Sequence, residues 1–325
     1  MAYAAAGAIG REAYIGDAPE LAAEDDVNPL GLTHRLHLLR TRKSAYELAC
    51  LREANAIAAR SHRAAELAFL DGHSEYEIHQ AYLWVSSLEE SELPYGSIVA
   101  LNRHCAVLHY QQRERSRPER SDSFLIDAGA AVHAYCADIT RTYTTTEGTF
   151  ASLVRGMDEL QQELCKGMKA NVDYRDMHLA AHRAIAGLLA EHELIHCGPT
   201  EAVENGLSSL FFPHGLGHFL GLQTHDVAGL IKDTRGTKIP QPPGHPFLRL
   251  TRVLEPGNVL TVEPGLYFID SLMDAWRHGK KRQLVNWDLV DELAPFGGIR
   301  IEDDVVVTDG EPENLSRDAF AKLSD

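Results

Sequence analysis

Several acidic side chains of this 325-residue chain lie in apolar surroundings. Asp127 and Asp138 belong to two apolar runs that a short Ala-Gly-Ala turn separates, so a hairpin would bring both carboxylates together. Glu263 lies inside another apolar run, and Arg300 and Glu302 alternate in a third, which places them on one face of a strand. Each of these acids needs a partner, because burying an unpaired carboxylate is costly.

Two explanations fit these acids. Structural salt bridges, such as one between Arg300 and Asp127, are the simpler explanation for any single residue. A metal site explains the whole set better, because His218 follows a Gly-rich turn and adds an imidazole to the four carboxylates. Such an oxygen-rich set suits Mn²⁺ or a similar divalent ion.

A second metal-binding pattern is the literal His-Glu-x-x-His of His192, Glu193 and His196. On a helix it would place two imidazoles on one face beside a glutamate base. However, a Cys-Gly-Pro sequence follows at once and should end the helix, and no glutamate lies between Glu204 and Glu255 to provide the usual third ligand. An HExxH zinc protease therefore stays an alternative.

The elements that must position these residues follow from local patterns. Capping boxes at Ser44 and Ser74 predict helices from 45 to about 70 and from 75 to about 88. Short β-branched or apolar runs and longer helical patterns predict strands at 98–101, 106–110, 124–126 and 131–143, helices at about 150–168 and 174–191, and strands at 259–268 and 299–307. This order favours an α+β domain with helices on one face of a mostly antiparallel sheet.

Composition excludes several classes of protein. With 31 Lys and Arg against 47 Asp and Glu, the net charge of −16 argues against nucleic-acid binding and against docking on an anionic membrane. No run approaches the roughly 20 apolar residues of a membrane helix. The five cysteines are odd in number and form no CxxC pair, which is typical of a reduced, cytoplasmic protein.

The motifs around the acids and histidines resemble those of the M24 pita-bread metallopeptidases. They are LIDAGA at 125–130, ADITRT at 137–142, FPHGLGH at 212–218, TVEPG at 261–265 and GIRIED at 298–303. They occur in the family's order, and the similarity runs from about residue 43 to 308. The pattern is most similar to the bacterial Xaa-Pro dipeptidase (prolidase) branch, which includes the organophosphorus acid anhydrolases.

The resemblance implies a pita-bread fold, a curved antiparallel sheet with helices on its outer face. It also implies two divalent ions, most consistent with Mn²⁺ and with Co²⁺ or Zn²⁺ as alternatives. Asp127 would bind one ion, His218 and Glu263 the other, and Asp138 and Glu302 both. Two such ions can share a hydroxide that attacks the bond before a C-terminal proline.

The same resemblance assigns roles to other residues. His109, His214 and His225 would bind substrate, move protons and hold the tetrahedral intermediate. The substrate-binding set would be Tyr95, Leu108, Arg249 and Arg300. An arginine on the proline carboxylate would restrict hydrolysis to dipeptides. A side activity on organophosphate triesters is also implied, and the non-enzymatic alternative is a pita-bread binding module, a class that typically loses metal ligands.

The expected domain organisation is one catalytic domain at 41–325, preceded by a remnant of an N-terminal domain or a linker at 1–40. In this branch a creatinase-like N-terminal domain helps to form the dimer. A homodimer is therefore expected, with a geometry that depends on that domain. The expected partner is an Xaa-Pro dipeptide substrate.

Overall fold

The computed structural model describes residues 13–16 and 27–323. Three helices open this part of the chain: α1 (Leu30–Arg40), α2 (Ala45–Leu70) and α3 (Glu75–Ser86). Both predicted capping boxes are present, with Glu47 closing on Ser44 and Glu77 on Ser74. Helix α1 was not predicted, because it buries none of its residues and so has no clear amphipathic pattern.

The first sheet has the strand order β1-β2-β5 and is antiparallel. Its strands are β1 (Ile98–Leu101), β2 (Ser123–Asp127) and β5 (Thr140–Thr144), and the short hairpin of β3 (Ala131–Val132) and β4 (Tyr135–Cys136) lies between β2 and β5 in sequence. Asp127 pairs with Ile98 on one side and with Thr140 on the other. The acid therefore stands at the end of a central strand, where both neighbours hold the backbone.

A helical stretch leads to the second set of strands. Its helices are α4 (Thr149–Lys166), α5 (Tyr174–Glu191), α6 (Pro199–Glu204) and α7 (Leu207–Phe211). The later elements are β6 (Val259–Val262), β7 (Gly265–Tyr267), α8 (Asp270–Arg277), α9 (Trp287–Leu293), β8 (Gly298–Arg300), β9 (Asp303–Val306), β10 (Glu313–Asn314) and α10 (Leu315–Ala321). The order β10-β9-β6 makes a second antiparallel sheet, and β7 pairs with β8.

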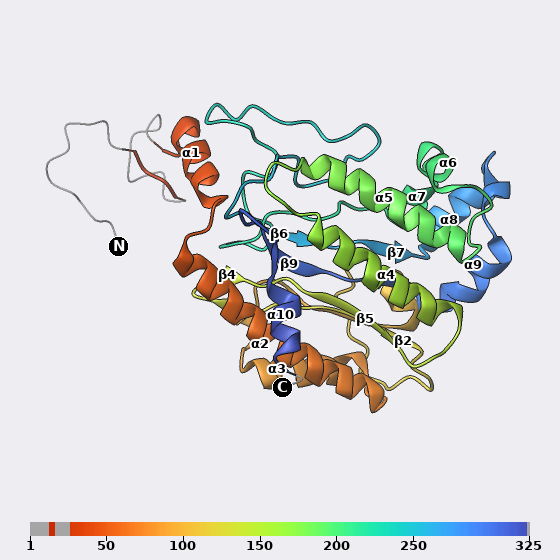
Figure 1. Ribbon diagram of the computed structural model, residues 1–325. Coiled ribbons are helices and arrows are strands. Elements are labelled where there is room, and N and C mark those ends of the chain that lie inside the picture. The colour runs from red at the N-terminus through yellow and green to blue at the C-terminus, as the bar shows by residue number, and fades with distance from the viewer. Residues whose placement is uncertain (1–12, 17–26, 324–325) are drawn as a thin grey trace, which may run out of the picture.

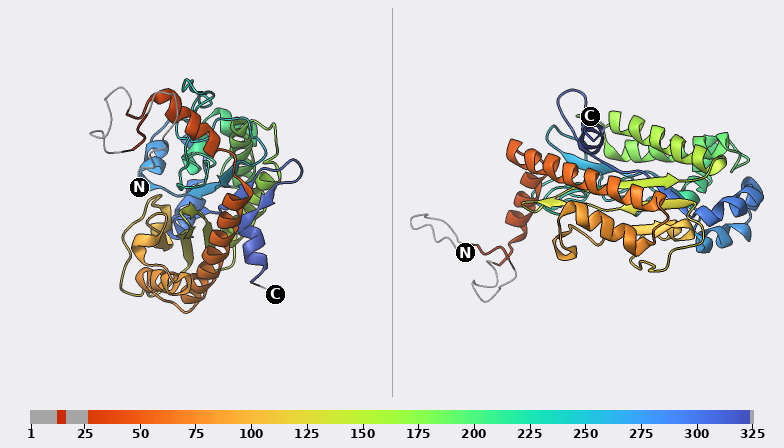
Figure 2. Two further views of the ribbon diagram at one scale, coloured as in Figure 1. Left: turned by 90° about the vertical axis from the view of Figure 1, so that its left-hand side faces the viewer. Right: turned by 90° about the horizontal axis from the view of Figure 1, so that it is seen from below.

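The two sets of strands are continuous through an antiparallel bridge between Thr140 and Glu302. Figures 1 and 2 show the strands between two pairs of helices, with α2 and α3 on one side and α4 and α5 on the other. The core follows this division. Phe69, Tyr82 and Phe124 belong to the first core cluster, whereas Phe150 and Leu189 belong to the larger second one.

Four of the predicted strands differ from the structure. The run 131–143 is three short strands, β3, β4 and β5, interrupted at 133–134 and at 137–139. The run 106–110 is wrong as a strand, since a 3-10 helix (Asn102–Ala106) and an irregular segment occupy this region. Ala106 and Tyr110 are buried by packing rather than by strand pairing, whereas Val107 is exposed. The runs 259–268 and 299–307 are each two strands, interrupted at Glu263 and at Glu302. Both interruptions fall at predicted metal ligands.

Across residues 13–16 and 27–323, no helix combines the length and the apolar character that crossing a membrane requires.

Candidate metal centre

One cavity of about 1300 Å³ collects the predicted site residues. All twelve line it: Tyr95, Leu108, His109, Asp127, Asp138, His214, His218, His225, Arg249, Glu263, Arg300 and Glu302. They come from segments as far apart as residues 95 and 302, so the fold, and not local sequence, brings them together.

Four of the five predicted ligands occupy strand ends and interruptions. Asp127 is the last residue of β2, Asp138 lies between β4 and β5, Glu263 follows β6, and Glu302 lies between β8 and β9. These positions expose a side chain to the cavity while the flanking strands fix the backbone. His218 lies on a loop, where its backbone N–H donates to Thr261 Oγ1 over 3.2 Å.

The distances within this group are short. His218 Nε2 lies 3.4 Å from Asp138 Oδ2 and 3.7 Å from Glu263 Oε1. Ligand atoms of Asp138, His218 and Glu302 all lie within 4.8 Å of one another. The Nδ1–H of His218 donates to the Phe219 carbonyl over 2.9 Å, which leaves Nε2 free to face the carboxylates. This orientation is the one that metal-binding histidines usually adopt.

Electrostatics also favours a cation here. Burial, followed by repulsion from Asp138, raises the pKa of Glu302 well above its usual value, and burial raises that of Glu263 to about 7. Burial raises the pKa of Asp127 as well, and its Oδ1 has no hydrogen-bond partner. For Asp138 burial also acts to raise the pKa, but the hydrogen bond and charge of His218, together with Tyr95 and His225, outweigh it and lower the pKa. Divalent ions would neutralise this repulsion and satisfy the free oxygen, so the residues fit a metal centre.

Arg300 is 5% exposed, and each nitrogen of its guanidinium donates a hydrogen bond to a neighbouring side chain. Its guanidinium donates to Asp127 Oδ2 over 2.7 Å, to the Tyr267 hydroxyl over 2.8 Å and to Thr140 Oγ1 over 3.2 Å. The salt bridge between Arg300 and Asp127 is therefore present, and it lies within the acidic group rather than apart from it. Thr140 Oγ1 in turn donates to Glu302 Oε2 over 2.6 Å.

Thr140 and Tyr267 were missed by sequence reasoning. Thr140 follows Asp138 by two residues at the start of β5, and the two-residue period of a strand could have placed both on one face. Tyr267 gives no comparable signal, because its partners lie far away in sequence. Its hydroxyl accepts from Arg300 and lies 2.9 Å from His214 Nε2.

The remaining predicted residues surround the acidic group. His214 donates from Nδ1 to the Gly215 carbonyl over 2.8 Å, and burial followed by the charge of Arg300 lowers its pKa to about 3. The ring of His225 lies 4.3 Å from that of His218. His109 and Arg249 are exposed to the cavity, and the Arg249 guanidinium makes no hydrogen bond or ion pair with any residue that the structure describes.

The HExxH pattern does not form a metal-binding helix. Helix α5 ends at Glu191, so His192 is its C-cap, and Glu193 adopts a left-handed conformation with φ 57°. The backbone of His196 instead donates to the Leu284 carbonyl. Within the described residues, these side chains form no metal-binding group. The alternative of an HExxH zinc protease is therefore wrong.

Comparison with known proteins now decides the family. The sequence pattern of metallopeptidase family M24 matches residues 49–309. The chain belongs to metallopeptidase family M24. It is 50% identical over 315 residues to the Xaa-Pro dipeptidase of Pectobacterium atrosepticum, covering 95% of this chain and 71% of that protein. It is also 50% identical over 295 residues to the Xaa-Pro dipeptidase of Xanthomonas campestris, covering 90% and 67%.

Solved structures of aminopeptidases P share the fold. Aminopeptidase P (PepP) of Pseudomonas aeruginosa matches with a TM-score of 0.66 and 28% identity, covering 90% of this chain and 62% of that one. Escherichia coli aminopeptidase P with the inhibitor Pro-Leu matches with a TM-score of 0.67 and 26% identity, covering 89% and 61%. The chain thus spans less than two thirds of the length of these aminopeptidases P. The predicted α+β pita-bread fold and the predicted metallopeptidase family are confirmed.

Proposed function

We propose that this M24 chain is an Xaa-Pro dipeptidase that hydrolyses dipeptides with a C-terminal proline. One observation carries the proposal. Five side chains from five separate segments, which sequence motifs mark as metal ligands, line one cavity that is large enough for a dipeptide. The similarity to two curated Xaa-Pro dipeptidases supports the choice of substrate.

We further propose that two Mn²⁺ ions bind here. Asp127 would hold one ion, His218 and Glu263 the other, and Asp138 and Glu302 would contact both. When bound, such ions polarise the scissile carbonyl and make water a strong nucleophile at neutral pH. The set of four carboxylates and one imidazole supports Mn²⁺ over softer ions, with Co²⁺ and Zn²⁺ as alternatives.

The protein's own residues would position the substrate and move protons. Of the two arginines that line the cavity, Arg249 is the one whose guanidinium has no hydrogen-bond or ion-pair partner among the described residues. It is therefore suited to pair with the proline carboxylate. Leu108 and Tyr95 line the same cavity as Arg249. The leaving group is a secondary amine that must gain a proton, and His109 and His225 face the cavity where it would lie.

His214 and Arg300 would act together with Tyr267. The hydrogen bonds from Arg300 to the Tyr267 hydroxyl and from that hydroxyl to His214 orient the imidazole, and burial followed by the charge of Arg300 lowers its pKa and keeps it neutral. His214 lies 3.7 Å from Glu263, beside the proposed metal position, where it could contact the tetrahedral intermediate. In this arrangement Arg300 positions its neighbours and Arg249 anchors the substrate.

We also propose a cytoplasmic homodimer with a catalytic domain at 41–325. Helix α1, in the segment 1–40, exposes Leu30, Leu36 and Leu39, an apolar surface that supports a subunit contact. The five cysteines have free thiols, which supports a reducing compartment. Sedimentation equilibrium, which measures the mass in solution, tests the dimer.

A peptide-length assay tests the function. The protein is chelated, reloaded with Mn²⁺ and incubated with Ala-Pro, Ala-Pro-Gly and Pro-Ala. We expect proline release from Ala-Pro and little cleavage of the others, because only Ala-Pro has a proline carboxylate for Arg249. Equal cleavage of Ala-Pro-Gly would indicate an aminopeptidase P instead, and no cleavage of Ala-Pro would refute the proposal.

A further inference from the structure

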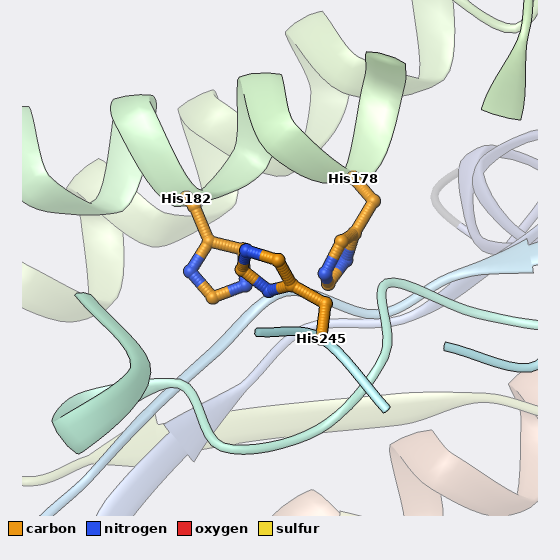
Figure 3. Close-up of side chains that lie close together, drawn as sticks. All are labelled: His178, His182 and His245. Atoms are coloured by element: carbon orange, nitrogen blue, oxygen red, sulfur yellow. The ribbon is translucent and has the colours of Figure 1, made fainter. Parts of the chain in front are cut away.

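A second cluster of histidines lies behind the wall of the substrate cavity. His178 and His182 project from one face of helix α5, four residues apart, and His245 meets them from the loop before Leu248, as Figure 3 shows. The ring centroids lie 4.6 Å apart for His178 and His182, and 4.7 Å and 4.4 Å from His245 to these two. One nitrogen of each ring lies within 4.8 Å of the other two.

The two rings on helix α5 are buried without adequate hydrogen bonds. His178 and His182 are each 1% exposed. Both ring nitrogens of His178 and Nε2 of His182 have no partner in the described structure. Nδ1 of His182 is held by the Ser208 hydroxyl at 3.0 Å, which leaves Nε2 as its free nitrogen. Buried polar atoms without partners are uncommon and costly, so three of them beside one another need an explanation.

We propose that His178, His182 and His245 form a binding site for a Zn²⁺ ion, separate from the acidic metal centre. Imidazole nitrogens are preferred ligands of Zn²⁺, and a pair of histidines at i and i+4 of a helix is a frequent part of such sites. A tetrahedral ion with Zn–N distances of about 2.0–2.1 Å separates neighbouring ligand atoms by about 3.3 Å. Small rotations of the three rings from their present positions would reach this spacing.

The surroundings select an ion different from Mn²⁺. A cavity of about 260 Å³ adjoins the rings, and the residues that line it include no carboxylate. It leaves room for a water, hydroxide or chloride as the fourth ligand. Burial lowers the pKa of His178 to about 3 and that of His182 to about 2, so both rings are neutral, as metal ligands must be, at neutral pH.

The site would fix one wall of the substrate cavity. His245 is two residues from Phe247 and four from Arg249, and both line that cavity. Phe212 packs between the two sites, with its ring 4.8 Å from that of His182 and 4.8 Å from that of His214. An ion bound to the three histidines would tie this loop to helix α5 and so hold the arginine that we assign to the substrate.

Metal counting on matched variants tests the site. Metal-free protein is loaded with Zn²⁺, dialysed and analysed for zinc per chain, for the wild type, His245→Ala and His245→Gln. His192→Ala, at the end of the same helix, is the control. We expect the wild type and His192→Ala to retain one more Zn²⁺ per chain than either His245 variant. Circular dichroism verifies that the variants are folded, which the position of His245 on a loop favours.

A second arm separates this site from the acidic centre. In Glu302→Ala the additional Zn²⁺ should remain. Replacing this Zn²⁺ with Co²⁺ should give the strong visible absorption of a tetrahedral ion. The double variant Glu302→Ala, His245→Ala should lack that absorption. Equal zinc content in the wild type and in both His245 variants would overturn the proposal and leave three neutral rings packed in the core. Either result is independent of the peptidase activity.

Discussion

Arg249 and Arg300 line the same cavity, yet their surroundings differ. Arg300 already donates to Asp127, Tyr267 and Thr140, whereas Arg249 is exposed and meets no acceptor among the described residues. A substrate carboxylate would have to compete for Arg300 but not for Arg249. Motif matching could not distinguish the two, because hydrogen-bond partners far away in sequence decide which guanidinium is free.

Replacing Arg249 should therefore affect binding of the free carboxylate selectively. We expect Arg249→Ala to raise KM for Ala-Pro by about 10- to 100-fold, the value of a charge-assisted hydrogen bond of about 1.5–3 kcal/mol. KM for the C-terminal amide of Ala-Pro should change little, and Arg249→Lys should restore part of the binding. Steady-state kinetics on both substrates measures this. Equal losses for the acid and the amide would exclude an anchoring role.

A buried imidazole makes stability depend on pH. His62 is fully buried, its Nε2–H donates to the Ala128 carbonyl over 2.9 Å, and burial lowers its pKa to about 3. In the unfolded chain the imidazole of His62 binds a proton below about pH 6.5, whereas in the native state it stays neutral until the pH is far lower. The native state therefore loses stability as the pH falls from about 6.5 towards 3. His62 thus stabilises the fold only in its neutral form.

We expect His62→Gln to flatten this dependence. Between about pH 4.5 and 6 the free energy of unfolding of the wild type should fall with decreasing pH more steeply than that of the variant, by about 1.4 kcal/mol per pH unit. Urea denaturation at several pH values measures both slopes. The exposed His133→Gln is the control and should keep the slope of the wild type. Identical slopes for the wild type and His62→Gln would show that His62 does not titrate in this way.

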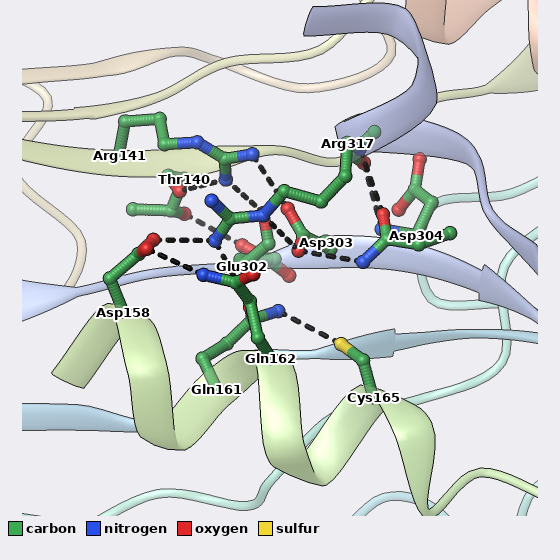
Figure 4. A network of polar contacts seen from close by, with 12 residues as sticks. Thr140, Arg141, Asp158, Gln161, Gln162, Cys165, Glu302, Asp303, Asp304 and Arg317 are labelled. Atoms are coloured by element: carbon green, nitrogen blue, oxygen red, sulfur yellow. Dashed lines mark hydrogen bonds and ion pairs between the residues drawn. The ribbon is translucent and has the colours of Figure 1, made fainter. Parts of the chain in front are cut away.

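At the scale of elements, strand β9 is held by a buried ionic network, shown in Figure 4. Asp303 accepts from Arg141 over 2.6 Å and from Arg317 over 2.8 Å, and Arg317 donates to Asp158 of helix α4 over 2.6 Å. Arg141 also donates to the backbone carbonyl of Glu302 over 2.7 Å. The network therefore joins β5, β9, α4 and α10 directly behind a proposed metal ligand.

Breaking this network should destabilise the whole domain. Asp303→Ala leaves the buried Arg141 without its carboxylate, and we expect a loss of about 3–5 kcal/mol in the free energy of unfolding. Chemical denaturation followed by circular dichroism measures it. The exposed ion pair of Glu163 and Lys166 provides the control, because Glu163→Ala should change stability very little. A loss no larger than that of the control would mean that the network is dispensable.

The sequence predicted some elements better than others for physical reasons. The capping boxes at Ser44 and Ser74 depend on contacts three residues apart, so the starts of α2 and α3 were correct. The run 106–110 is wrong as a strand because short apolar runs have no period that separates strand from irregular core. The interruption at Glu302 arises from tertiary structure and had no local signal, whereas Pro264, which cannot donate a ladder hydrogen bond, marks the interruption at Glu263 in the sequence.

At the scale of the molecule, both halves of the fold contribute to the acidic centre. Asp127 and Asp138 belong to the half with α2 and α3, and Glu263 and Glu302 to the strands that follow α4 and α5. Four of the 47 acidic residues gather there, so the net charge of −16 reflects the centre in part. Ions bound between the halves would stabilise the folded state, because they bind it in preference to the unfolded chain.

We propose above that these five residues bind two ions and that turnover requires both. The most direct measurement loads chelated protein with Mn²⁺ alone, counts manganese per chain and assays Ala-Pro hydrolysis, for the wild type, Glu302→Ala and the control His192→Ala. We expect about two ions per chain in the wild type and the control. In Glu302→Ala we expect fewer ions and a turnover more than about 100-fold lower, since even outer-sphere partners of a metal site are worth 10–100-fold. Unchanged manganese and unchanged turnover in Glu302→Ala would contradict the proposal.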